Sequence, residues 1–420
     1  MPPPETSPQS PHRVAEVARL FLRLGFTAFG GPAAHVALIE EEVVHRRNWL
    51  DRQHFLDIVS AVNFIPGPNS TELAIHVGYL RAGWRGLVAA GVCFIVPAML
   101  IILPIAWAYV AFGAKPGVGH ALVGIKACMV AIVVVAMGRF AKTGVRDPFT
   151  TAIALLSLAS AVLLQHYHIP QPELIILAAA ALAGLIRAAA RPAPAAATPS
   201  PHPLTPSSPH PDLRRTSFFV LPLSLAPATF TVQLTTMALF FLKVGATLFG
   251  SGYVLASFLH SGLVEQHRWL TEQELLDAIA VGQVTPGPLL TAATFIGYLL
   301  SARNFGGGTG GGILGGVVAT TAIFLPSFCF VAILGPVLPR LRANRLARGA
   351  LDGMNAAVVS LILVVSIWFA RSVMWNPAGH VERLGVAVFA LALLILIVTK
   401  LNPTWLIAAS ALIGLIVYGL

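Results

Sequence analysis

The sequence of 420 residues contains few charged side chains. Only 10% of its residues are Asp, Glu, Lys or Arg, whereas 56% are hydrophobic and the mean hydropathy is +0.79. A soluble globular domain carries about a quarter charged residues, so this composition excludes a soluble protein. The apolar residues form continuous runs rather than alternating with polar ones, which argues against a membrane β-barrel. The sequence therefore predicts an all-α polytopic membrane protein.

Cysteine is scarce as well. Three widely separated cysteines, Cys93, Cys128 and Cys329, form neither a metal site nor a disulfide framework. The histidines do not follow a zinc or haem spacing, and no Gly-x-x-x-x-Gly-Lys-Ser/Thr sequence is present for binding nucleotide phosphates. We therefore expect no metal, no cofactor and no enzymatic activity.

The net charge of +10 comes without a basic patch interleaved with aromatic residues, so we expect no nucleic-acid partner. Arginine-rich cytoplasmic loops explain the charge better. Residues 1–12 are rich in Pro and Ser and lack the apolar core of a signal peptide. We interpret them as a disordered cytoplasmic tail of a multi-pass protein in a bacterial-type cytoplasmic membrane.

Two Pro-Gly-Pro sequences interrupt long apolar segments. Proline removes a backbone N–H and clashes with the preceding turn, so a helix cannot pass through either segment undisturbed. At membrane depth, a broken backbone is tolerated only where protein or a watery cavity surrounds it. The helix that starts after the break presents free N–H groups and the positive end of its dipole to an anion. The two segments are Pro66-Gly67-Pro68, followed by Asn69, Ser70 and Thr71, and Pro286-Gly287-Pro288, followed by Thr291.

The two segments belong to an internal repeat. Phe21–Gly30 aligns with Phe241–Gly250 at the offset that also aligns the two Pro-Gly-Pro sequences. We predict two homologous halves, residues 13–190 and 218–420, joined by a Pro/Ala-rich linker, residues 191–217. Ordinary spans of bilayer length are expected near 86–112, 118–140, 149–166 and 171–190, and near 311–338, 347–370, 383–400 and 403–420.

The basic loops favour opposite orientations of the two halves. Arg139, Lys142 and Arg146 follow the second ordinary span of the first half, whereas the basic loop of the second half, 340–348, follows its first. If both loops are cytoplasmic, equivalent spans run in opposite directions, as in an inverted repeat. The basic linker then requires one more crossing, for which 218–230 is a candidate. We expect inverted topology, with broken or re-entrant helices at the Pro-Gly-Pro segments.

These motifs resemble the chromate ion transporter family in its long, two-half form, over nearly the whole chain. The resemblance implies export of chromate from the cytoplasm, driven by the membrane potential or a proton gradient, with sulfate as a competitor. The second half departs in having Gly252 where the first has Pro32. The matching stretches are Phe29-Gly30-Gly31-Pro32 with Ala34 and His35, Arg47-Asn48-Trp49-Leu50, Pro66-Gly67-Pro68, Gly78-Tyr79 and Gly83, then Phe249-Gly250-Ser251-Gly252, Trp269-Leu270, Pro286-Gly287-Pro288, Gly297-Tyr298 and Phe324-Leu325-Pro326-Ser327.

We predict that the dianion binds where the two halves meet, held by donors that need no deprotonation. These are the backbone N–H groups and side chains of the two helix starts, and the amides of Asn63 and Gln283. The alternative is that the prolines only kink the helices. The glycine breaks are further candidates for substrate binding, although glycines there also permit close helix packing: Gly30, Gly31, Gly250 and Gly252. Two cations at matched positions, Arg23 and Lys243, are candidates as well, although they could instead extend to the lipid headgroups.

Five ionisable residues are candidates for coupling transport to protons. Glu72 is the foremost, because a carboxylate beside a dianion repels it unless the carboxylate is protonated. Asp57 and Asp277 also suit capping or loop anchoring, and His35 suits packing. Lys126 lies within a span, so we expect it to face the interior, toward Asp57 or Glu72.

The resemblance thus implies export of chromate, with sulfate as a second substrate, and the two broken-helix halves favour a secondary transporter that works by alternating access. Its partners are the oxyanion and the lipid bilayer, and a homodimer remains open. The alternatives are an anion channel or an importer of sulfate-like oxyanions.

Overall fold

The computed structural model describes residues 11–113, 116–167, 169–191, 228–250, 252–335, 337–375, 381–399, 401 and 403–419. Over these residues the regular secondary structure is helical, joined by turns and breaks, apart from one isolated bridge between Trp375 and Val381. Within these described ranges, seven helices are long and apolar enough to cross a membrane. The prediction of an all-α polytopic membrane protein is confirmed. Most of the predicted tail and linker, and most of the candidate crossing 218–230, lie outside the described residues.

The first half begins with short helices separated by breaks. α1 (Pro11–Thr27) and α2 (Gly31–Glu40) are separated by the glycine break, and η1 (Glu41–Arg46) continues α2 as a π-helix. α3 (Arg52–Val62) starts after Asp51, whose side chain caps it by accepting a hydrogen bond from the His54 N–H at 2.9 Å.

The next helix, α4 (Ser70–Phe112), starts after the first Pro-Gly-Pro. The chain reverses within it at Ala82 and Gly83, where Gly83 has a φ of +60°. The two arms touch closely, since a methyl group on Gly78 would collide with the Gly86 carbonyl. α5 (Pro116–Gly144), α6 (Pro148–His166) and α7 (Pro172–Ala190) follow, close to the predicted spans.

The second half repeats this order of elements. Gly297 lies against the carbonyl of Gly315 just as Gly78 lies against Gly86. The elements are α8 (Ala228–Thr247), η3 (Gly252–Val254), α9 (Leu255–Leu259), η4 (His260–Gln266), α10 (Glu272–Val284), η5 (Leu289–Thr291), α11 (Ala292–Leu299), η6 (Leu300–Asn304), α12 (Gly308–Leu334), α13 (Leu338–Ala343), α14 (Arg345–Met374), α15 (Arg383–Val398) and α16 (Pro403–Gly419).

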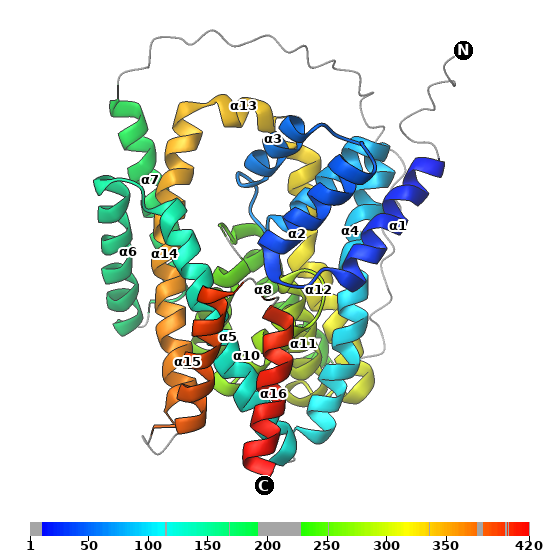
Figure 1. Ribbon diagram of the computed structural model, residues 1–420, viewed down its shortest axis with the longest axis vertical. Helices are drawn as coiled ribbons and strands as arrows, with labels where there is room; N and C mark the ends of the chain where they lie inside the picture. The colour runs from blue at the N-terminus through cyan, green and yellow to red at the C-terminus, as the bar shows by residue number, and fades with distance from the viewer. Residues whose placement is uncertain are drawn as a thin grey trace.

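Helices of each half pack against helices of the other half. α14 of the second half packs against α6 and α7, while α5 of the first half packs against α15 and α16. Each half also keeps one close internal pair, α1 with α4 and α8 with α12 (Figure 1). Glycine permits both pairs, because a methyl group on Gly25 would meet Pro97 and one on Gly245 would meet the Ile323 carbonyl. This packing brings the Pro-Gly-Pro segments to the junction between the halves.

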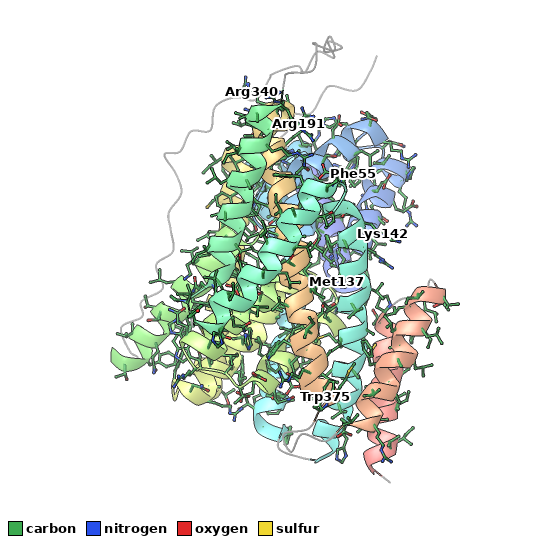
Figure 2. All side chains as sticks on the ribbon, turned by 90° about the vertical axis from the view of Figure 1, so that its left-hand side faces the viewer. Phe55, Met137, Lys142, Arg191, Arg340 and Trp375 are labelled. Atoms are coloured by element: carbon green, nitrogen blue, oxygen red, sulfur yellow. The ribbon has the colours of Figure 1, made fainter. Side chains whose placement is uncertain are left out.

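Equivalent helices can be followed by their labelled residues in Figure 2. α5 rises from Met137 to Lys142, toward the end of the molecule that carries Arg191 and Arg340. α14 starts at that same end and descends toward Trp375. The basic residues labelled in the figure therefore gather at one end of the helices.

Candidate functional site

Each Pro-Gly-Pro segment is hydrogen-bonded to the glycine break of the other half. The Gly67 N–H donates to the Leu248 carbonyl at 2.7 Å, and the Gly287 N–H donates to the Ala28 carbonyl at 2.9 Å. Both glycines have positive φ, +143° and +96°, which other residues rarely adopt. All six residues of the two segments are buried. The two breaks thus cross at the interface between the halves, and the glycine N–H groups hold the halves together rather than standing free for an anion.

The helix start after the first crossing carries polar side chains into the protein interior. Ser70 and Thr71 are buried, and the Thr71 hydroxyl has no hydrogen-bond partner among the described residues. His35 Nδ1 lies 3.4 Å from Ser70 Oγ. The amides of Asn69 and Asn63 bind each other instead, at 2.9 Å. The start of α4 therefore offers hydroxyl groups on its inner side.

At the equivalent helix start in the second half, the hydroxyl groups already have hydrogen-bond partners. The Thr291 hydroxyl donates to the Pro288 carbonyl at 2.6 Å, and the Thr294 hydroxyl pairs with that of Thr320 at 2.6 Å. Gln283 is the exception, because its amide nitrogen is buried without a partner among the described residues.

Glu72 lies at the centre of the first crossing. Its side chain is fully buried, and Ser327 of α12 donates to one carboxyl oxygen at 2.5 Å. The other oxygen is buried without a partner among the described residues. A methyl group on Gly67 would collide with this carboxyl group and lie 3.0 Å from Ser327 Oγ. Glu72 is therefore enclosed by the Pro-Gly-Pro segment of its own half and a hydroxyl group from the other half.

Two histidines extend this polar cluster. His35 is buried, and its Nε2 lies 3.1 Å from the Ala28 carbonyl, which also accepts from Gly287. His76 follows Glu72 by one helical turn, so the two side chains share a face of α4. His76 Nδ1 is buried without a partner among the described residues. Neither His76 nor Ser327 was predicted as a site residue from the sequence, although the spacing of four between Glu72 and His76 and the Pro326-Ser327 motif were available signals.

The second crossing has different side chains around it. Where Gly67 faces Glu72 and Ser327, a methyl group on Gly287 would lie 2.8 Å from the Ala98 side chain. The two crossings therefore share a backbone hydrogen bond between the halves but differ in chemistry: the first has the buried carboxyl group of Glu72, and the second has His35 against the Ala28 carbonyl.

The two predicted cations have different surroundings. Arg23 pairs with the buried Glu42 at 2.5 Å, and Arg46 and Arg47 reach the same carboxyl group. Lys243 is exposed. The structure thus gives Arg23 a carboxylate partner and leaves Lys243 at the surface.

A second ionic cluster joins the halves elsewhere. Lys126 of α5 lies 3.1 Å from Asp277 of α10, and Tyr109 of α4 donates to the other carboxyl oxygen at 2.8 Å. The predicted partner of Lys126 was therefore wrong, whereas its interior orientation is confirmed. Asp57, the equivalent of Asp277, interacts with Gln53 of its own helix at 3.3 Å. The two aspartates thus have different surroundings.

The glycine breaks serve close packing and unusual backbone angles. Gly30, Gly31 and Gly250 have φ between +80° and +100°. A methyl group on Gly250 would collide with Val358, and one on Gly252 would lie 3.1 Å from Leu289. In the part of the chain that the structure describes, no group of three His, Cys, Asp or Glu side chains could hold a metal ion.

Comparison with known proteins gives consistent results. The family described as "Chromate transporter" matches residues 15–185 and 235–415. A "Chromate transport protein" of Cupriavidus metallidurans is 29% identical over all of this chain and 98% of that protein. A protein of the same name from Pseudomonas aeruginosa is 28% identical over all of this chain and 94% of that protein. An uncharacterized transporter of Methanocaldococcus jannaschii is 26% identical over 85% of this chain and 84% of that protein. No solved structure gives a significant match.

Proposed function

The chain belongs to the chromate transporter family, and on this basis we propose that it is a secondary transporter that exports chromate across a bacterial-type cytoplasmic membrane. The family supports a transporter of chromate rather than an enzyme. The membrane-length helices support a multi-pass membrane protein. Outward transport, the membrane potential as its driving force and a binding site at the first crossing are further parts of this proposal.

The observation that carries the proposal is the first crossing. A buried carboxyl group, Glu72, stands beside the hydroxyls of Ser70 and Thr71 at the start of a helix, and its neighbour Ser327 comes from the other half. The helix start favours an anion, because its first N–H groups and its dipole point toward it. A charged Glu72 would oppose a dianion, so substrate binding and protonation of Glu72 favour each other.

Alternating access follows from the position of the crossings. The two hydrogen bonds from Gly67 and Gly287 tie each half to the other, and in this conformation both segments are buried. Movement of one half against the other would open the first crossing to either side in turn. The membrane potential, negative inside, then drives the dianion outward.

The arrangement of helices supports an inverted repeat. α5 and its equivalent α14 run in opposite directions, and the ends that carry Lys142, Arg191 and Arg340 lie together (Figure 2). The positive-inside rule places this end in the cytoplasm. We propose that the N-terminal tail lies on the same side.

Sulfate is a second candidate substrate, because chromate and sulfate share charge and tetrahedral shape. An anion channel is the competing function, since a channel would also use helix starts as anion contacts. The burial of both Pro-Gly-Pro segments favours a carrier, because it leaves them enclosed by protein.

Chromate uptake into everted membrane vesicles tests the proposal. We expect saturable uptake that requires an energised membrane and that excess sulfate inhibits. Uptake that rises linearly with chromate would indicate a channel instead. Absence of uptake above control vesicles, with the protein present in the membrane, would overturn the proposal.

A further inference from the structure

An arginine-rich pocket lies at the basic end of the molecule, remote in sequence from the Pro-Gly-Pro segments. It lies among the end of α5, the start of α6, the end of α7 and the start of α14, and has a volume of about 320 Å³. These positions are the ends of four membrane-length helices, so the pocket lies at a membrane boundary. The volume falls at the low end of the range for small-ligand pockets, about 300–1,000 Å³.

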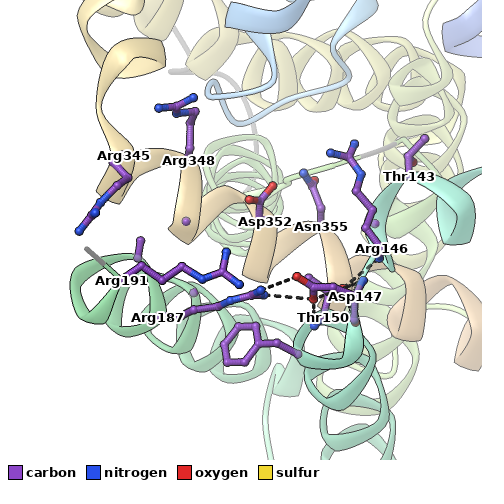
Figure 3. Close-up of a pocket in the computed structure, with 15 residues that line it drawn as sticks. Thr143, Arg146, Asp147, Thr150, Arg187, Arg191, Arg345, Arg348, Asp352 and Asn355 are labelled. Atoms are coloured by element: carbon purple, nitrogen blue, oxygen red, sulfur yellow. Dashed lines mark hydrogen bonds and ion pairs between the residues drawn. The ribbon is translucent and has the colours of Figure 1, made fainter. Parts of the chain in front are cut away.

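The charge of the pocket is strongly positive. Figure 3 shows Arg345 and Arg348 on α14 across from Arg187 on α7 and Arg191 just past its end. Five arginines line the pocket against two aspartates. The five arginines are Arg146, Arg187, Arg191, Arg345 and Arg348.

Only one of these arginines is neutralised by an ion pair within the described pocket. Arg187 binds Asp147 with both of its terminal nitrogens and lies 4.4 Å over the Phe149 ring. This contact holds the pKa of Asp147 well below its usual range, because the guanidinium donates to the carboxylate. Asp147 also caps α6 through Thr150, so the pair fixes the wall of the pocket.

Three of the remaining arginines, Arg191, Arg345 and Arg348, offer donors to a ligand, and Arg146 and Arg348 also interact electrostatically with Asp352. Arg345 Nη2 donates a hydrogen bond to the Ala189 carbonyl at 3.4 Å, and its buried Nη1 has no partner among the described residues. Arg191 and Arg348 are exposed at the pocket. The other carboxylate, Asp352, opposes an anion but is exposed.

The chemistry of the pocket points to a phosphate-type oxyanion. Guanidinium groups bind such oxygens two at a time, with a planar geometry that lysine lacks. The surroundings favour a lipid as the source, because α6 and α7 expose apolar side chains such as Leu155, Leu182 and Ile186. Basic pockets between helices at the cytoplasmic side are suited to lipid headgroups.

We propose that this pocket binds the phosphate group of an anionic lipid, where it clamps α7 of the first half to α14 of the second. The two helices already meet closely, since a methyl group on Gly184 would collide with the Gly349 carbonyl. A headgroup bound by Arg191 and Arg348 would bridge the same two helices. Free phosphate is the alternative source of the same chemistry.

The apparent melting temperature of the purified full-length protein in neutral detergent tests this proposal. We expect phosphatidylglycerol to raise it by several degrees more than phosphatidylcholine does. Arg191→Gln/Arg348→Gln should lose at least half of this increase. The matched control is Arg139→Gln/Arg340→Gln, which removes the same charge from exposed residues at this end outside the pocket, and it should keep the increase.

A second ligand series separates the two sources. Inorganic phosphate, compared with sodium chloride at equal ionic strength, should have little effect if the ligand is a lipid. An increase with inorganic phosphate that the pocket variant loses would assign the site to a free oxyanion and overturn the lipid assignment. Equal lipid responses in pocket and control variants would overturn the site itself. If the double variant melts below the wild type without lipid, Arg348→Gln alone provides the same comparison.

Discussion

Replacing Lys126 by methionine tests the buried ion pair that joins the two halves. The side chains of Lys126 and Asp277 are 12% and 7% exposed, with 3.1 Å between Nζ and Oδ1. Removing one partner of a buried pair costs about 3–5 kcal/mol, because the other charge remains buried without compensation. The substitution also removes the hydrogen bond that Lys126 Nζ donates to Gln273 Oε1 at 2.9 Å. We expect Lys126→Met to lower the free energy of unfolding by about 3–5 kcal/mol.

Thermal unfolding in detergent measures this loss. At roughly 2–4 °C per kcal/mol, the apparent melting temperature should fall by roughly 6–20 °C. Lys142→Met is the matched control, because Lys142 lies on the same helix and is exposed; it should change the melting temperature by a degree or so.

A second substitution distinguishes the charge from the packing of the lysine stem. Adding Asp277→Asn to Lys126→Met removes the uncompensated charge and still lets Tyr109 donate a hydrogen bond. The double variant should therefore recover more than half of the loss. If Lys126→Met melts like Lys142→Met, or if Asp277→Asn deepens the loss, the ion pair does not stabilise the protein as argued.

Two further predictions concern single positions. Gly67→Ala should destabilise the protein by about 1–3 kcal/mol, because its φ of +143° is strained for alanine and its methyl group would collide with Glu72; Gly138→Ala, which has open space around it, should be neutral or stabilising by about 0.5–1 kcal/mol in thermal unfolding. Arg187 lowers the pKa of Asp147, so this carboxylate contributes stability above its ordinary pKa of about 4 and loses it as the pH falls toward the folded-state value. Asp147→Asn should therefore melt below the wild type at pH 7, and the difference should shrink below about pH 4; a difference independent of pH would contradict the assignment.

The helices could be predicted from the sequence because their signals are local. The span expected at 149–166 is α6, and the span expected at 171–190 is α7. The two Pro-Gly-Pro segments break their helices where proline requires it. The common offset between the halves also predicted which elements would be equivalent.

The contacts between the halves could not be predicted in the same way. The bond from Ser327 to Glu72 and the pair formed by Lys126 and Asp277 join residues far apart in sequence. They depend on how the halves pack, which no local pattern records. The bonds from Gly67 and Gly287 to the opposite glycine breaks are of the same kind. Polar residues in apolar helices indicated that partners were needed, but not which ones.

The central claim, that chromate binding and protonation of Glu72 favour each other, implies that a proton moves with the dianion. One comparison in everted vesicles tests it most directly. Chromate uptake is measured with and without an imposed pH gradient, acidic outside the vesicles, at constant membrane potential, for the wild type, Glu72→Gln and Glu173→Gln. Glu173 is the matched control, because it is also a buried glutamate that accepts hydrogen bonds from two serines. We predict that the gradient stimulates uptake by the wild type and Glu173→Gln, while Glu72→Gln takes up chromate without stimulation. Full stimulation of Glu72→Gln would contradict the account.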